Sequence, residues 1–115
     1  MITFNNLSEF KRNLKLGVKL HAVNHTAFAG RKADSRVIYK DLDLGVRPVS
    51  IVQSNSFALK TVKTDGTEVD SWCSYPKASQ CIIKDNALTI LEEDGRHPRR
   101  EGQNMIPVLT YKFVD

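Results

Sequence analysis

The sequence predicts a mainly β fold of the α+β class, a small antiparallel, partly open β-barrel or curved sheet with one short N-terminal helix. Three observations support this prediction. Apolar residues recur at helical spacing near the N-terminus. From Val18 onward, apolar and polar residues alternate as they do in half-buried strands. Turn-forming residues such as Asp65-Gly66 separate the alternating runs, as in hairpins.

The N-terminal helix is expected over about residues 6–16 of the sequence. Asn6 can cap it, and Glu9 stands three residues later, the spacing at which its carboxylate reaches back to the cap. Gly17 follows the predicted end, where a left-handed backbone is favoured. Helical spacing places three residues on the apolar face: Leu7, Phe10 and Leu14.

Residues 18–114 are expected to be rich in β structure. The run "VKLHAVN" alternates from Val18, "CIIKDNALTI" forms a hairpin around Asp85-Asn86, and "IPVLTYKFV" closes the sheet. Trp72 is expected to anchor the core, which places Cys73 on the opposite face of its strand. Pro76 cannot donate a ladder hydrogen bond, so this strand should end near Tyr75.

The chain is expected to form a single domain over residues 1–115. Two stretches interrupt the strand pattern, at about 24–45 and 92–105, and are expected to be long loops. The first contains one strand candidate, "RVIYK" at 36–40. Long loops inside a compact domain often carry function, so both stretches supply candidate contact residues.

Composition and charge restrict the location and the partners of the protein. There is no apolar run near the roughly 20 residues that span a bilayer, and the N-terminus lacks the pattern of a secretory signal. We therefore expect a cytoplasmic protein that does not interact with membranes. The formal net charge is +4 and the pI is about 9.2, a modest tilt toward acidic partners such as nucleic acid.

The spacing of the cysteines and histidines and the absence of catalytic motifs predict no metal site, no cofactor and no enzymatic activity. Cys73 and Cys81 are too far apart for a zinc motif, and His21 and His25, four residues apart, would be adjacent on a helix but not on a strand. A disulfide between the two cysteines is conceivable on adjacent strands, although a reducing cytosol argues against it. The sequence contains neither a G-x-S-x-G nucleophile motif nor a phosphate-binding glycine loop.

Charged residues gather in batches that suggest a binding surface. Arginines and lysines can bind either an acidic protein surface or phosphates. The two acidic pairs are alternative polar contacts. Such pairs more often lie on solvated loops than in a divalent-cation site. The expected partner-binding residues are Arg31, Lys32, Arg36, Arg96, Arg99, Arg100, Asp41, Asp43, Glu92 and Glu93. The alternative nucleic-acid contacts are Lys11, Arg12, Lys15 and Lys19.

Four segments of the chain are similar to segments of known proteins. They are "GVRPVSIVQSNSFALKT" at 45–61, "DGTEVDSWCSYPKAS" at 65–79, the N-terminal "FNNLSEFKRNLKLG" and the closing "LTYKFV". They resemble small uncharacterised proteins carried by phages, plasmids and conjugative elements of Gram-positive bacteria. The resemblance implies an accessory protein of a mobile element, a setting rich in inhibitors of host defence such as anti-CRISPR proteins.

Two functions are expected from the resemblance and the charge pattern. The first is a non-catalytic phage or mobile-element protein that binds and inhibits a host nucleic-acid-targeting nuclease, such as a guide-RNA-directed one. The alternative is a small nucleic-acid-binding β-barrel that assists replication, transfer or transcription of the element.

Overall fold

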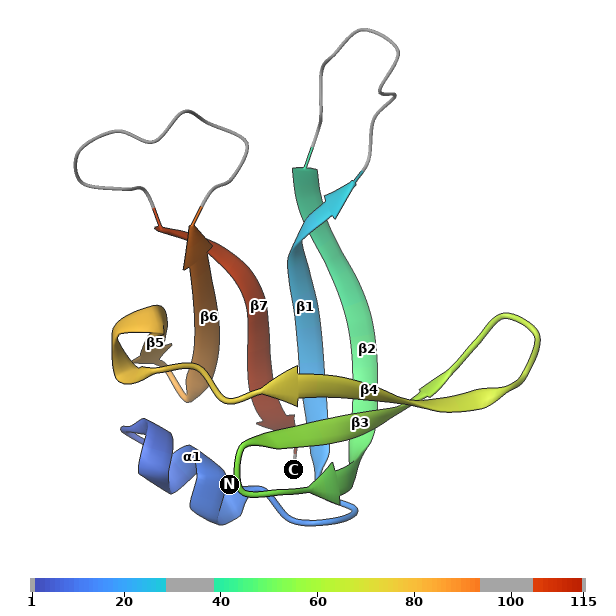
Figure 1. The fold of residues 1–115 in the computed structure, drawn as a ribbon, viewed down its shortest axis with the longest axis horizontal. Coiled ribbons are helices and arrows are strands. Elements are labelled where there is room, and N and C mark those ends of the chain that lie inside the picture. Colours follow the sequence, from blue (N-terminus) through green and yellow to red (C-terminus); the bar gives the residue numbers. More distant parts are fainter. Residues whose placement is uncertain (1, 29–38, 94–104, 115) are drawn as a thin grey trace, which may run out of the picture.

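The computed structural model describes residues 2–28, 39–93 and 105–114 (Figure 1). Within these residues, one α-helix precedes seven strands that form a single antiparallel sheet, which does not close into a barrel. The predicted fold class, a mainly β fold with one short N-terminal helix, is therefore confirmed. None of the helices in the described part of the chain has the length and apolar character needed to cross a bilayer.

The long strand β2 (Tyr39–Val52) joins the two halves of the sheet. Its early residues pair with β1 (Lys19–Phe28) and its last residues with β3 (Ser56–Val62). The hairpin of β3 and β4 (Glu68–Ser74) crosses in front of β1 and β2 (Figure 1). The strand order is β4-β3-β2-β1-β7-β6-β5, with β4 and β5 at the edges. The elements are α1 (Leu7–Asn13), β1 (Lys19–Phe28), β2 (Tyr39–Val52), β3 (Ser56–Val62), β4 (Glu68–Ser74), the 3₁₀ turn η2 (Ala78–Gln80), β5 (Cys81–Lys84), β6 (Ala87–Glu93) and β7 (Met105–Val114).

Both predicted hairpin turns are present. Asp85 and Asn86 have φ angles of 54° and 57°, the left-handed pair that a two-residue turn between β5 and β6 requires. Gly66, with a φ of 88°, lies in the turn between β3 and β4. The local turn chemistry therefore sets the register of these two hairpins.

The helix is shorter than the sequence predicts. The Asn6 side chain accepts a hydrogen bond from the Glu9 backbone N–H at 2.9 Å, which confirms the cap, and the Glu9 carboxylate reaches back to the backbone N–H of Asn5 rather than that of Asn6. The helix ends at Asn13 because Leu14 adopts an extended backbone. Gly17 has the expected positive φ, 87°, in a turn beyond this end.

Helix α1 packs against the core and covers it. Phe10 is fully buried, and its ring centroid lies 5.2 Å from that of Phe113 on β7 and 6.2 Å from that of Phe57 on β3. Phe10 thereby joins the crossed hairpin to the opposite half of the sheet. The buried cluster consists of Phe4, Phe10, Leu14, Leu20, Ala22, Val49, Phe57, Leu59, Leu88, Ile90 and Tyr111.

The predicted loops at 24–45 and 92–105 are partly strand. β1 continues to Phe28 and β2 begins at Tyr39, while β6 continues to Glu93 and β7 begins at Met105. The backbone hydrogen bonds of these strand ends come from pairing with residues distant in the sequence. Local composition does not reveal such pairing. Of the strand candidate at 36–40, the last two residues belong to β2 and the others lie outside the described residues.

The predicted burial of Trp72 is wrong. Trp72 is 54% exposed on β4, and Cys73 packs against the core instead. Phe57 of β3, fully buried, pairs directly with Cys73, so the core face of β4 is the face that carries Cys73. β4 ends at Ser74, two residues before Pro76, as predicted.

Candidate functional site

Most of the predicted basic contacts lie beyond what the structure describes. The residues concerned are Arg31, Lys32, Arg36, Arg96, Arg99 and Arg100, all within 29–38 or 94–104, outside the described residues. Their part in binding stays a prediction. The candidate site is therefore built from the remaining predicted residues and from those that the sheet brings next to them.

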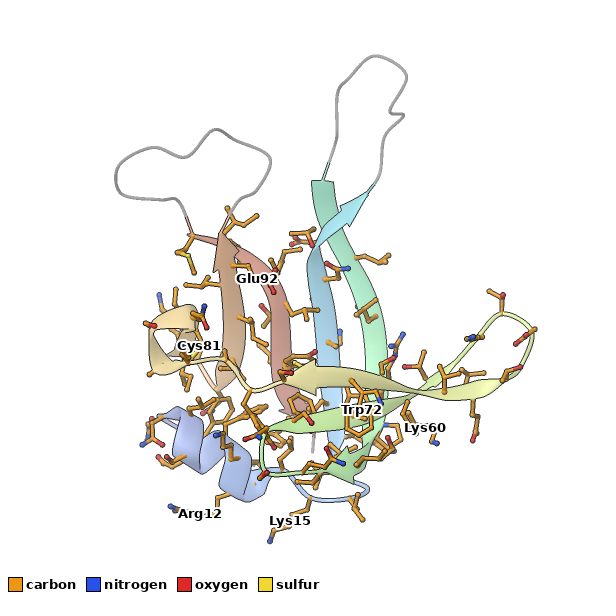
Figure 2. The ribbon with its side chains drawn as sticks, viewed as in Figure 1. Arg12, Lys15, Lys60, Trp72, Cys81 and Glu92 are labelled. Carbon is orange, nitrogen blue, oxygen red and sulfur yellow. The ribbon has the colours of Figure 1, made fainter. Side chains whose placement is uncertain are left out.

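The predicted acidic residues divide between two places. Asp41 and Asp43 lie on β2, each beside a histidine of β1. Glu92, labelled in Figure 2, pairs with Ile106 near the end of β6, and its negative charge raises the pKa of Cys73. Glu93 is the last residue of β6 and pairs with Met105. The acidic pairs are thus strand residues rather than loop faces.

The predicted nucleic-acid contacts do not form one row. Lys11, within α1, places its ammonium 4.6 Å from the centre of the Tyr75 ring, a cation–π contact. Arg12 and Lys15 project away from the sheet at the helix end of the molecule (Figure 2). Lys19 begins β1 and is two residues from His21, so both belong to the same face of that strand.

That face belongs to a surface that we call the outer face. It is the side of β2, β1, β7, β6 and β5 opposite the core residues Leu20, Leu88 and Tyr111. Strand alternation and pairing place the following residues on it: Lys19, His21, Val23, His25, Asp41, Asp43, Val46, Ile82, Lys84, Ala87, Thr89, Leu91, Thr110 and Lys112.

A line of hydrogen bonds crosses the outer face over four strands. His25 Nδ1 lies 2.8 Å from Asp41 Oδ1, and its Nε2 lies 2.7 Å from Thr110 Oγ1. Thr110 Oγ1 in turn lies 2.9 Å from Thr89 Oγ1. The donor at each contact depends on the tautomer of His25. With the proton on Nδ1, the ring donates to Asp41, and Nε2 accepts from the hydroxyl of Thr110, which in turn accepts from that of Thr89.

A second histidine–carboxylate pair lies beside this line. His21 Nε2 is 2.7 Å from Asp43 Oδ1, which also accepts the backbone N–H of Gly45 at 2.8 Å. The Gly45 N–H, followed by His21, lowers the pKa of Asp43 below its ordinary value. Asp43 therefore remains an anion under all but acidic conditions and holds His21 in place.

His21 and His25 were not among the expected contact residues, although both take part in the outer face. That they form no metal pair stays a prediction; among the described residues, no three His, Cys, Asp or Glu side chains gather as a potential metal-binding group. The missed signal was the alternation of β1 beyond Asn24. Extending that alternation to residue 25 places His25 on the same face as His21.

The outer-face line has the carboxylate–imidazole–hydroxyl order that activates nucleophiles in some hydrolases. Here the hydroxyl belongs to Thr110 in the middle of a sheet, where the same contacts cross-link β2, β1, β7 and β6. Cross-strand side-chain pairs of this kind stabilise sheets. We therefore interpret the line as a set of structural hydrogen bonds that hold the side chains of the outer face in place.

The two cysteines are free thiols in the structure, without a disulfide between them. Burial raises the pKa of Cys73, and the nearby negative charge of Glu92 raises it further against a lowering contact with Tyr111. Burial also raises the pKa of Cys81. A reactive cysteine needs a lowered pKa, so neither thiol has the electrostatic surroundings of a nucleophile.

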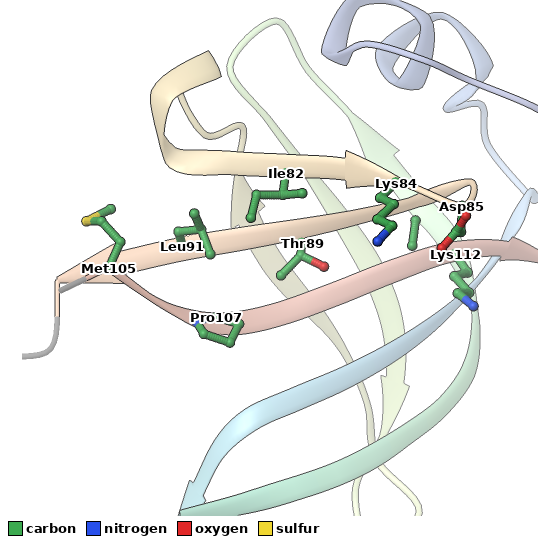
Figure 3. Close-up of a pocket in the computed structure, with 9 residues that line it drawn as sticks. Ile82, Lys84, Asp85, Thr89, Leu91, Met105, Pro107 and Lys112 are labelled. Carbon is green, nitrogen blue, oxygen red and sulfur yellow. The ribbon is translucent and has the colours of Figure 1, made fainter.

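The outer face also carries a shallow apolar hollow of about 440 Å³ over β5, β6 and β7 (Figure 3). Ala87, 7% exposed, forms its floor, and Ile82, 51% exposed, stands on the edge strand β5. Two ammonium groups, those of Lys84 and Lys112, border it. Its lining residues are Ile82, Lys84, Asp85, Ala87, Thr89, Leu91, Met105, Pro107 and Lys112.

The hollow and the hydrogen-bonded line meet at Thr89. This residue lines the hollow and is the last residue of the hydrogen-bonded line. The candidate site is thus a continuous surface with an apolar part over β5 to β7 and a polar, ordered part over β7 to β2. Comparison of the chain with family models, with curated proteins and with solved structures finds no match.

Proposed function

We propose that the chain is a non-catalytic binding protein that contacts its partner through the outer face of the sheet. The observation that carries this proposal is the hollow, an exposed apolar surface bordered by lysines. Exposed apolar side chains gathered beside charged ones characterise sites where proteins dock. Ile82 and Met105 both contribute exposed apolar surface there.

The partner in this proposal is a host nucleic-acid-targeting nuclease, such as a guide-RNA-directed one, which the chain inhibits. The identity of the partner rests on the resemblance to mobile-element proteins, whose neighbours include inhibitors of host defence. The charged outer face supports it, because nucleases expose both basic channels and acidic catalytic surfaces. The proposal places the protein in the cytoplasm of the bacterial host, where such nucleases act.

The test is co-purification of the tagged chain with a defined nuclease. The tagged protein is expressed in bacteria that carry a guide-RNA-directed nuclease, and the nuclease is measured by mass spectrometry and by DNA cleavage in the eluate. We expect the nuclease to be retained and its cleavage reduced. Val62→Asp, at an exposed position of β3 away from the outer face, is the matched control and should retain the nuclease equally. Elution without nuclease would refute this partner.

Nucleic-acid binding is a second candidate, favoured by one observation. Lys112 of β7 pairs directly with His21 of β1 and with Ala87 of β6, which pairs with Lys84, so basic groups follow a row across the outer face. Such a row can neutralise successive phosphates. A gel-shift titration of single- and double-stranded oligonucleotides at low salt tests it. Binding should weaken steeply with salt and with Lys112→Glu, and a flat titration would eliminate this candidate.

A further inference from the structure

We propose that the hollow takes an apolar side chain from a partner segment that carries carboxylates on either side of it. This inference rests on the proposed binding function and names the chemistry of its partner. It is argued from three properties of the surface: the shape and lining of the hollow, the charges at its border, and the edge position of β5.

The lining of the hollow suits an aliphatic or aromatic side chain. Ala87 is small enough to leave a depression between its cross-strand neighbours Lys84 and Lys112. Leu91 and Pro107, which pair with each other, line the hollow farther along β6 and β7, toward Met105 (Figure 3). A volume of about 440 Å³ lies within the range of roughly 300–1,000 Å³ typical of ligand sites. Burying one large apolar side chain contributes about 1.5–3 kcal/mol before the costs of association.

The charges at the border favour an acidic neighbour. Within the described ranges, no carboxylate lies in ion-pair contact with Lys84 or Lys112, in contrast to Lys60, whose ammonium is 3.2 Å from Asp70. Asp85 is the one acidic residue of the lining, so two lysines outnumber it. A partner carboxylate beside either ammonium forms a charge-assisted hydrogen bond that the free protein lacks.

A protein segment fits this surface better than nucleic acid does. None of the nine lining residues, all within the described part of the chain, is aromatic, so the hollow offers no platform on which a base can stack. The hollow also adjoins β5, which pairs on one side only. An extended segment along this edge would place alternate side chains beside Ile82 and Lys84, at the border of the hollow.

An NMR titration of the ¹⁵N-labelled full chain tests the chemistry of the hollow. The probe is the peptide acetyl-Asp-Glu-Leu-Phe-Glu-Asp-amide, compared with the same peptide in which lysines replace the acids, with an acidic peptide in which Ser-Gly replaces Leu-Phe, and with a dT₁₂ oligonucleotide. We expect the first peptide alone to shift the resonances of the hollow. Ile82→Asp and Lys112→Glu should each weaken its binding about tenfold. The matched controls, Val62→Asp and Lys63→Glu on the β3–β4 hairpin, should leave its binding unchanged.

Each alternative result overturns the inference. Equal shifts by the two acidic peptides mean that charge alone is recognised, and shifts caused by dT₁₂ alone mean a nucleic-acid surface. Absence of shifts with every probe means that the hollow does not bind such a segment. Spectra of the free variants, recorded first, establish that each substitution leaves the fold intact.

The co-purification experiment separates this inference from the proposed function. If the nuclease is retained equally by wild type, Ile82→Asp and Lys112→Glu, the hollow is not the contact while the binding function stands. If the acidic peptide binds the hollow but the nuclease is not retained, the inference stands and the nuclease partner is wrong.

Discussion

Phe57 on β3 and Cys73 on β4 are direct cross-strand partners, and both pack against the core. Their pairing sets the inward face of the β3–β4 hairpin. It also leaves Trp72, the largest side chain of β4, on the solvent side. The hairpin is therefore held to the rest of the protein by Phe57 and its neighbours rather than by the tryptophan.

Substitutions at these two aromatic residues should have unequal effects on stability. Phe57→Ala removes a fully buried ring and should lower the free energy of unfolding by about 3–5 kcal/mol. Trp72→Ala, at a side chain 54% exposed, should cost about 1 kcal/mol or less. Urea unfolding followed by far-UV circular dichroism measures both. A larger loss for Trp72→Ala would show that β4 packs with the opposite face inward.

The contact between His25 and Thr110 should appear as an energetic coupling. A double-mutant cycle with His25→Ala and Thr110→Val removes the 2.7 Å hydrogen bond from either side. We expect a coupling of about 0.5–1.5 kcal/mol in the free energy of unfolding. The same cycle with His25→Ala and Asp65→Ala, which share no contact, should be additive within about 0.5 kcal/mol. Equal couplings in both cycles would contradict the hydrogen-bonded line.

Stability should decrease in acid because several carboxyl pKa values are lowered in the folded state. Thr67 lowers the pKa of Asp65 through its backbone N–H, and the hydroxyl of Ser50, followed by Lys60, lowers that of Asp70. A lowered folded-state pKa contributes stability above the unfolded value of 3.8, and this contribution is lost as the pH falls below 3.8.

Urea unfolding midpoints at neutral pH and at successive values below 3.8 measure this dependence. Asp70→Asn removes one contributing carboxyl, so the variant should be less stable at neutral pH and should lose less stability in acid than wild type. Glu68→Gln, at an exposed residue two positions away on β4, is the matched control. An Asp70→Asn profile parallel to that of wild type would count against the contacts of Asp70 with Ser50 and Lys60.

The two thiols should react at different rates with a disulfide reagent at neutral pH. Burial raises the pKa of both, and for Cys73 a contact with Tyr111 lowers it while the charge of Glu92 raises it. Cys73 should be the slower thiol because it pairs directly with the fully buried Phe57 on the core face of β4, and denaturation should remove the difference. The variants Cys73→Ala and Cys81→Ala assign each rate to its residue. Faster labelling of Cys73 would mean that β4 leaves the core readily.

Much of the fold was predictable because its signals are local. Asn6 caps the helix, while Asp85 and Asn86 adopt the turn conformation that their side chains tolerate. The continuation of β1 and β2 beyond the predicted loop boundaries was not predictable in this way. Those strand ends depend on pairings such as Asn24 with Leu42, which join residues far apart in the sequence.

The candidate site was predictable only in part. Asp41 and Asp43 were expected as contact residues, but their partners His25 and His21 were not, because each pair joins two strands. The hollow was missed for a similar reason. Its lining comes from β5, the turn that follows it, β6 and β7, and strand alternation alone does not show that these side chains share a face.

The sequence by itself determined the fold class, the helix cap and the two tight hairpin turns, because each depends on a few neighbouring residues. The tertiary structure alone decided which face of each strand is buried and which side chains meet. Alternation along a strand distinguishes two faces but does not say which of them packs. For β4, that choice followed from its pairing with Phe57, and it exposed Trp72. For the outer face, it followed from the sheet order, which set His25 between Asp41 and Thr110.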